Sequence, residues 1–158
     1  MIDPKYRTVL ECIFPLLSEE PPLPWVITGS LGFALQGLEV EVQDVDIQTD
    51  RAGAYEVERR LSSHVVRPVA WSESGRIRSH FGALEIGGVK VEIMGDLQKR
   101  MMDGRWEEPV DVIRNRRWVM WQGLRLPVLS LEYEYQAYRI LGRAEKAETL
   151  KKWLENHP

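Results

Sequence analysis

Two short polar runs, Gly29-Ser30 and Asp44-Val45-Asp46, are the residues of this chain whose types and spacing indicate chemistry. Asp44 and Asp46 are two positions apart, so on a strand both carboxylates point to one face of the sheet. Carboxylates held this close repel each other unless a cation lies between them, and their oxygens are ligands that suit Mg²⁺. Gly29-Ser30 opens a helical pattern, where free backbone N–H groups and the helix dipole favour an anion. The sequence therefore predicts a phosphate-binding turn beside a divalent-metal site.

The apolar residues around these runs predict the elements that position them. Trp25 to Thr28 is typical of a short buried strand, and it leads directly into Gly29. Apolar side chains then recur at the spacing of one helix face: Leu31, Ala34, Leu35 and Leu38. Val45 and Ile47 alternate with the acidic pair and therefore point the opposite way, into a core.

A later run of the sequence carries further acidic side chains on or beside a predicted strand. In the run from Val89 to Met94, the side chains alternate between an apolar face and a face that carries Lys90 and Glu92. Glu85, on the preceding strand, and Asp96, after Gly95, are the alternatives. Glu92 is preferred because its side chain points away from the apolar face.

This ordered set of elements resembles the nucleotidyltransferase superfamily, which includes aminoglycoside and lincosamide nucleotidyltransferases and the minimal nucleotidyltransferases of toxin–antitoxin loci. Their shared pattern is an apolar strand, Gly-Ser or Gly-Gly, a helix, Asp-x-Asp on the next strand and a third acid on a later strand. Here the pattern covers residues 24–96 well and the C-terminal helices weakly. The resemblance implies an α+β fold with a nucleotidyltransferase-like mixed β-sheet flanked by helices.

The resemblance also implies a Mg²⁺-dependent enzyme that moves a nucleoside monophosphate from a nucleoside triphosphate, with ATP the expected donor, to a hydroxyl acceptor. Asp44, Asp46 and Glu92 would be the catalytic residues and the metal ligands, while Gly29 and Ser30 would bind the nucleotide. Relatives often carry Lys at the start of a C-terminal helix, which makes Lys146 a further nucleotide-binding candidate; a solvated helix face is the alternative. The acceptor stays open between a small molecule, a protein and an RNA end.

One departure from the pattern favours a second hypothesis. Many relatives have Arg and Thr just before the paired acids, where this chain has Val40 and Val42. The second hypothesis is therefore a catalytically weak or inactive nucleotidyltransferase-fold protein that binds nucleotide or a protein partner. A purely structural module without a ligand is the third.

Length and composition indicate a single domain over residues 1–158, with its core in 24–96 and a C-terminal hairpin and helices in 112–156. A formal net charge of -3 argues against a general nucleic-acid binder. No apolar run approaches the ~20 residues that span a bilayer, so no membrane partner is expected. The single cysteine, Cys12, has no partner for an internal disulfide, which suits a cytoplasmic location.

Apolar and turn patterns predict the remaining elements. Asp3, Asp50 and Ser130 are expected as helix N-caps, and the helix after Asp50 should bury Tyr55. Pro68 suggests an edge strand. Two hairpins should turn at Gly87-Gly88 and at Gln122-Gly123, which predicts strands at 76–86, 89–94, 117–121 and 124–128. Residues 97–111 are expected as a polar connection. Gly142 should separate the last two helices, which are expected at 131–141 and 144–154.

The remaining partner expectations concern aromatic and basic residues. A homodimer or a small helical protein could complete the cleft, with exposed Trp106, Trp118 or Trp121 as the contact surface. Basic side chains beside these tryptophans more simply form a solvated strand end: Arg114, Arg116 and Arg117. Arg76, Arg78 and His80 alternate along their strand and are candidates for the face that carries Glu92.

Overall fold

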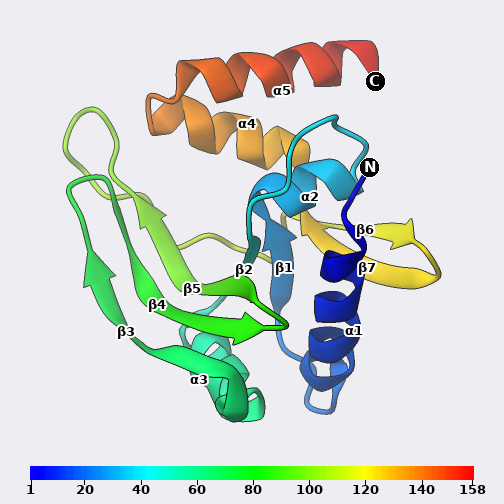
Figure 1. The fold of residues 1–158 in the computed structure, drawn as a ribbon. Coiled ribbons are helices and arrows are strands. Elements are labelled where there is room, and N and C mark those ends of the chain that lie inside the picture. Colours follow the sequence, from blue (N-terminus) through cyan, green and yellow to red (C-terminus); the bar gives the residue numbers. More distant parts are fainter.

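The structure, a computed structural model, describes residues 1–158 and contains one mixed seven-stranded β-sheet with five α-helices (Figure 1). The strands are β1 (Trp25–Thr28), β2 (Val45–Thr49), β3 (Val65–Glu73), β4 (Ile77–Ile86), β5 (Val89–Lys99), β6 (Arg116–Trp121) and β7 (Leu124–Leu129). The helices are α1 (Pro4–Ser18), α2 (Gly29–Leu35), α3 (Arg51–Arg60), α4 (Leu131–Ile140) and α5 (Ala144–Asn156), with a short 3₁₀ turn at Ser62–His64. The predicted α+β fold with a mixed sheet is confirmed.

The strand order β3-β4-β5-β2-β1-β7-β6 places the strands of the predicted site at the centre of the sheet. β2 runs antiparallel to β1 and parallel to β5, while β1 and β7 are parallel. Both expected hairpins form, β4–β5 and β6–β7. Because β2 and β5 are neighbours, side chains at matched positions on the two strands lie next to each other.

Apolar alternation explains which side of the sheet is buried. The apolar residues of β2 and β5, including Val45, Ile47, Val91 and Ile93, share one cluster with side chains of α1 and α3. In Figure 1 these two helices lie together, away from α4 and α5. Asp46 and Gln48 of β2 and Met94 of β5 alternate with this cluster and line a cavity together with residues of α4.

The three predicted N-caps are present. Side-chain oxygens of Asp3, Asp50 and Ser130 accept hydrogen bonds from backbone N–H groups in the first turns of α1, α3 and α4. Each bond satisfies one of the N–H groups that a helix start leaves free. α4 and α5 form an antiparallel pair that packs on α2 through a smaller apolar cluster: Phe33, Leu38, Leu131, Tyr138, Ala147 and Leu150. None of the helices has the length and apolar character to cross a membrane.

Three local expectations were wrong. Tyr55 is exposed, because its hydroxyl pairs with His80 Nδ1 at 3.0 Å instead of entering the core. That contact turns His80 toward α3, and Arg78 bonds Gln98, so neither lines the face of Glu92. β5 also continues to Lys99, into a segment expected to be a loop, because its pairing with β4 resumes after a bulge.

Candidate functional site

Asp46 and Glu92 are direct neighbours on the polar face of the sheet. Asp46 is the second residue of β2, and the parallel register pairs it with Glu92 on β5. Asp44 immediately precedes β2 instead of lying within it. The structure therefore brings the three predicted acids to one place at the strand ends, although their catalytic role stays a prediction.

Lys90 lies between two of these acids. Its Nζ is 2.9 Å from Glu92 Oε1 and 3.5 Å from Asp44 Oδ2. The bond to Glu92 and the charge of both carboxylates raise the pKa of Lys90. Glu92 and Lys90 are two residues apart on β5, so the alternation that selected Glu92 also places this ammonium group on the same face.

The ionisation of Asp46 is unfavourable in this arrangement. Burial and, to a smaller extent, the charges of Glu92 and Asp44 raise the pKa of Asp46 to about 7, while Lys90 and Lys146 oppose the shift. Desolvation and like charge both disfavour a carboxylate, and a nearby cation reverses both effects. Asp46 is thus the residue of the site that depends most on added positive charge.

The donor set is suitable for Mg²⁺. Three carboxylates supply the oxygen ligands that Mg²⁺ prefers, and Lys90 already places one cationic group between two of them. No three His, Cys, Asp or Glu side chains are arranged as a metal-binding group. The Lys90 ammonium group lies between Asp44 and Glu92. That Asp44, Asp46 and Glu92 bind a metal ion stays a prediction.

Gly29 provides the close approach between the turn and Asp46. Its φ of 69° is in the left-handed region, and a Cβ at this position would clash with Asp46 Oδ2. Only glycine adopts this conformation without strain. Ser30 Oγ, in contrast, accepts a hydrogen bond of 3.0 Å from the Gln43 N–H, which ties the segment before β2 to α2.

A cavity of about 460 Å³ adjoins this turn, and we call it the outer cavity. It brings together Gly29, Ser30 and Asp46 with Lys146 of α5, so the predicted nucleotide-binding residues share one site. Its remaining lining residues are Phe33, Leu38, Val40, Glu41, Gln43, Tyr138, Arg143, Thr149 and Leu150. Cationic side chains next to an apolar wall suit a ligand with both a phosphate part and an aromatic part.

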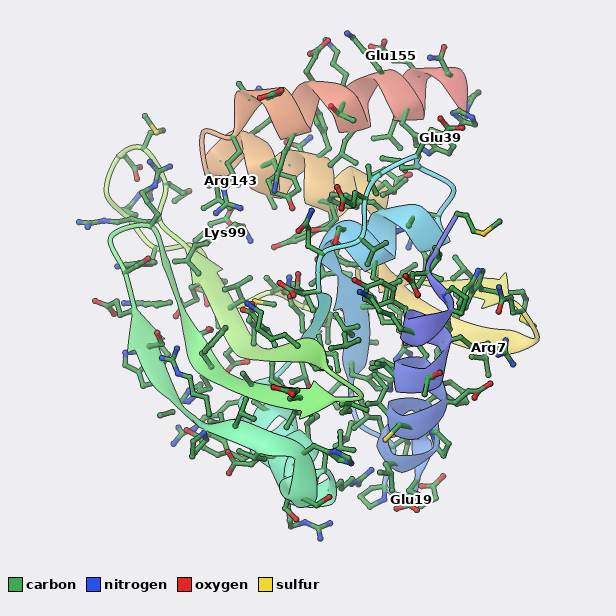
Figure 2. The ribbon with its side chains drawn as sticks, viewed as in Figure 1. Arg7, Glu19, Glu39, Lys99, Arg143 and Glu155 are labelled. Atoms are coloured by element: carbon green, nitrogen blue, oxygen red, sulfur yellow. The ribbon has the colours of Figure 1, made fainter.

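A second, narrower cavity of about 140 Å³ lies on the other side of Asp46, between the polar face of the sheet and α4; we call it the inner cavity. Its lining residues are Thr28, Gly29, Asp46, Gln48, Ile77, Met94, Leu97, Lys99, Tyr133, Glu134, Ala137, Tyr138, Leu141 and Arg143. Figure 2 shows Lys99 and Arg143 near each other, where the end of β5 approaches the α4–α5 connection.

Glu134 is the site residue that the sequence analysis missed. Glu134 Oε2 accepts hydrogen bonds from Thr28 Oγ1 at 2.7 Å and from the Gly29 N–H at 3.2 Å. Burial raises the pKa of Glu134 to about 7, although these two bonds act in the opposite direction. A carboxylate in the buried face of α4 was the available signal, because ionisable residues are rarely fully buried without a partner.

Comparisons with known proteins agree on one family. The sequence model of the aminoglycoside-2''-adenylyltransferase family matches residues 10–152. A solved Thermotoga maritima protein, provisionally assigned as a nucleotidyltransferase, is 57% identical, with a TM-score of 0.85 over 99% of this chain and 97% of that one. No curated protein matches closely enough to add to this comparison.

Two antibiotic-modifying enzymes share the fold at 16% identity. ANT(2'')-Ia, solved with adenylyl-2''-tobramycin, gives a TM-score of 0.59 over 95% of this chain and 90% of that one. The lincosamide adenylyltransferase LnuA, solved with lincomycin, gives 0.60 over 91% and 95%. At this identity the likeness establishes the fold alone.

Proposed function

The chain belongs to the aminoglycoside-2''-adenylyltransferase family of nucleotidyltransferases, and from this premise we propose that it transfers AMP from Mg²⁺-ATP to a hydroxyl group of a small acceptor. The observation that carries the proposal is the position of Asp46. Its carboxylate lines both cavities, so a group bound in one can meet a group bound in the other at this residue.

In this reaction the acceptor oxygen bonds to the α-phosphorus of ATP while the bond from that phosphorus to the bridging oxygen breaks. Pyrophosphate leaves with the bond electrons, and the acceptor hydroxyl loses its proton. Glu92 either completes the metal ligands or accepts this proton, since it lies beside Asp46. When bound, Mg²⁺ neutralises the triphosphate and stabilises the attacking and leaving oxygens.

The outer cavity is the proposed nucleotide site. Lys146 and Arg143 supply positive charge for the phosphates, close to the Gly29-Ser30 turn. The apolar wall, which includes Phe33 and Leu38, suits a nucleobase. Ser30 Oγ already accepts a bond from Gln43, and the Gly29 N–H donates to Glu134, so the Ser30 N–H and the two cations are the phosphate-binding groups that we propose.

Nucleotide binding without turnover is the second candidate function. Lys90 favours it, because its ammonium group forms ion pairs with two of the three acids. Relatives have polar residues at the positions of Val40 and Val42. Here Val42 packs against the large core cluster and Val40 against the smaller cluster of α2, α4 and α5. Both candidates predict nucleotide binding, and only the first predicts a product.

Asp46→Asn and Asp44→Asn test the carboxylate site. Each should lower AMP transfer by about 100-fold or more, as expected when a charged group that acts in the transition state is lost. The two variants should differ in stability without metal. Asp46→Asn should melt at a higher temperature, because a buried carboxylate near like charges is removed. Asp44→Asn loses its ion pair with Lys90 and should be unchanged or slightly less stable.

Two measurements test the variants. One is thermal melting with and without Mg²⁺-ATP. The other is transfer of labelled AMP from α-labelled ATP to tobramycin, lincomycin or myo-inositol. Glu85→Gln is the matched control on the partner strand, and its melting shift and transfer should equal those of the wild type. A Mg²⁺-ATP shift that survives in both Asp variants would exclude the carboxylates as the functional site. A shift in the wild type without product from any acceptor would support binding without turnover.

A further inference from the structure

Gln48 is a buried polar residue without a complete set of partners. It is two residues after Asp46 on β2, so its side chain points to the same face and lines the inner cavity. The residue is 5% exposed, and its Oε1 accepts no hydrogen bond. An unsatisfied buried acceptor destabilises the fold, because it has lost its bonds to water and gained none in return. A ligand that donates a hydrogen bond from within the cavity would offset this cost.

The same cavity offers a second acceptor. Glu134 is 4% exposed, and only its Oε2 is hydrogen-bonded, to Thr28 and Gly29. Glu134 lies on α4 and Gln48 on the facing sheet, so the two acceptors lie on opposite walls. Two fixed acceptors on opposite walls suit a ligand with hydroxyl groups at more than one position.

The cavity is lined by as many acidic as basic residues. The acidic ones are Asp46 and Glu134, and the basic ones are Lys99 and Arg143. Lys99 is 2% exposed and is held by Tyr133 Oη at 2.7 Å and by Glu107 Oε2 at 3.4 Å. Arg143 is exposed and lies at the mouth of the cavity. A neutral ligand leaves the ion pair of Lys99 with Glu107 intact, whereas a charged ligand would add an uncompensated charge among buried groups.

The size of the cavity limits the ligand to one ring. A closed protein cavity of about 150 Å³ accommodates a molecule the size of benzene; the inner cavity is about 140 Å³ and is open on one side, so it takes one ring with part of its hydroxyl groups at the opening. Apolar side chains line it between the polar groups, including Met94, Leu97 and Leu141. Alternating apolar and polar wall suits a ring with carbon faces and hydroxyl edges.

We propose that the inner cavity is the acceptor subsite and takes one compact, uncharged, six-membered polyol ring, with Gln48 Oε1 accepting a hydrogen bond from a ring hydroxyl. The proposal rests on the proposed function and selects a small molecule over a protein or RNA end. A second ring hydroxyl then lies beside Asp46, where its oxygen attacks the α-phosphorus, its proton passes to a site carboxylate, and pyrophosphate leaves toward the outer cavity.

Gln48→Leu tests the subsite without nucleotide or metal. Binding of myo-inositol to the wild type, measured by ligand-observed NMR, should be detected at millimolar concentration, and the dissociation constant should rise at least about 10-fold in the variant, the effect of losing one well-placed hydrogen bond. Deoxystreptamine, a cyclitol of the same ring size with two amino groups, should bind more weakly than myo-inositol. The variant should melt at a higher temperature, because the unsatisfied oxygen is gone.

Ala137→Leu is a second variant that keeps the proposal falsifiable. Its longer side chain projects from α4 into the cavity and should abolish ring binding, whereas Ala144→Leu, on the exposed start of α5, should not. In transfer assays with a ring acceptor, Gln48→Leu should raise the KM for the acceptor and leave the KM for ATP unchanged.

Two results would overturn the proposal. One is that myo-inositol does not bind the wild type, or binds the wild type and Gln48→Leu with equal dissociation constants. Gln48 Oε1 would then be bonded by water alone. The other is preferred binding of deoxystreptamine. Neither result bears on the melting shift with Mg²⁺-ATP, so failure of the subsite is distinguishable from failure of the transfer reaction.

Discussion

The outer and inner cavities meet at Asp46 but are built in different ways. The outer cavity, about 460 Å³, is formed by α2, the segment before β2 and the two C-terminal helices, and its cations Arg143 and Lys146 are exposed. The inner cavity, about 140 Å³, is formed by sheet strands and one face of α4, and its polar side chains Gln48, Lys99 and Glu134 are almost fully buried.

Because of this difference, the outer cavity should attract charged groups, whereas the inner cavity should select ligands by their shape. Exposed cations attract a phosphate group over several ångströms but are screened by salt and adapt to many anions. Buried groups with fixed partners reject a ligand that does not match them, because each unmatched group keeps its desolvation cost. We therefore expect substitutions in the inner cavity to change stability and ligand choice, and those in the outer cavity to change nucleotide affinity.

Gly29→Ala should have the largest effect because it acts on the wall that the cavities share. A left-handed conformation costs about 1–2 kcal/mol for alanine, and the new Cβ would displace the Asp46 carboxylate. Misplacing a reacting group by ~1 Å lowers rates about 100-fold. The free energy of unfolding, measured in urea, and the rate of AMP transfer should therefore both fall.

Gly87→Ala provides the matched control for Gly29→Ala. Gly87 also has a positive φ, of 57°, but no atom lies within 4 Å of its added Cβ. The control should lose only the conformational part of the stability and keep full transfer. An equal loss of AMP transfer in both variants would show that the reaction does not depend on the close contact of Gly29 with Asp46.

Glu134→Gln changes a residue that lines the inner cavity and not the outer one, so it tests the inner cavity alone. The folded pKa of Glu134 is about 7, above the ordinary 4.5, so the folded protein holds the proton more tightly. The stability linked to this proton is present below about pH 4.5 and is lost as the pH rises through about 7. The Gln variant should therefore be more stable than the wild type at about pH 8, by roughly 3 kcal/mol, and equal to it at about pH 4.

Urea unfolding in EDTA across this pH range measures the effect of Glu134→Gln. Glu132→Gln, on the exposed face of the same helix, is the control and should follow the wild type at every pH. Asp46 titrates in the same window and remains in both variants, so only the difference between curves reports Glu134. Parallel curves for the wild type and Glu134→Gln would contradict a raised pKa.

Lys146→Met should have the smallest effect, confined to the outer cavity. Lys146 is exposed, with its Nζ 5.4 Å from the centre of the Tyr138 ring, so screening limits its contribution. We expect the dissociation constant of Mg²⁺-ATP to rise about 10-fold at low salt and less at high salt. Calorimetric titration measures it, with Lys151→Met as the control. If Lys146→Met also weakened the binding of myo-inositol, the two cavities would not bind their ligands independently.

Local patterns predicted most of the elements, because capping and strand alternation depend on neighbouring residues alone. Asp3, Asp50 and Ser130 cap their helices as expected, and the alternation along β5 correctly placed Glu92 on the polar face. Tyr55 was expected in the core and lies at the surface, since the position of His80 on a different strand decides its contact. Oligomeric state and the role of the exposed Trp118 stay predictions.

By itself, the sequence determined the order of the elements, the sheet face of the acids and the resemblance to the family that the comparisons established. Only the tertiary structure decided which residues meet across elements. Glu134 is 105 residues from Gly29, and its bond to that turn depends on where α4 packs. Gln48 is two positions from Asp46, yet its lack of a partner becomes visible only when α4 covers the sheet. Spacing along a chain encodes the direction of a side chain, whereas the packing of distant elements decides what that side chain meets.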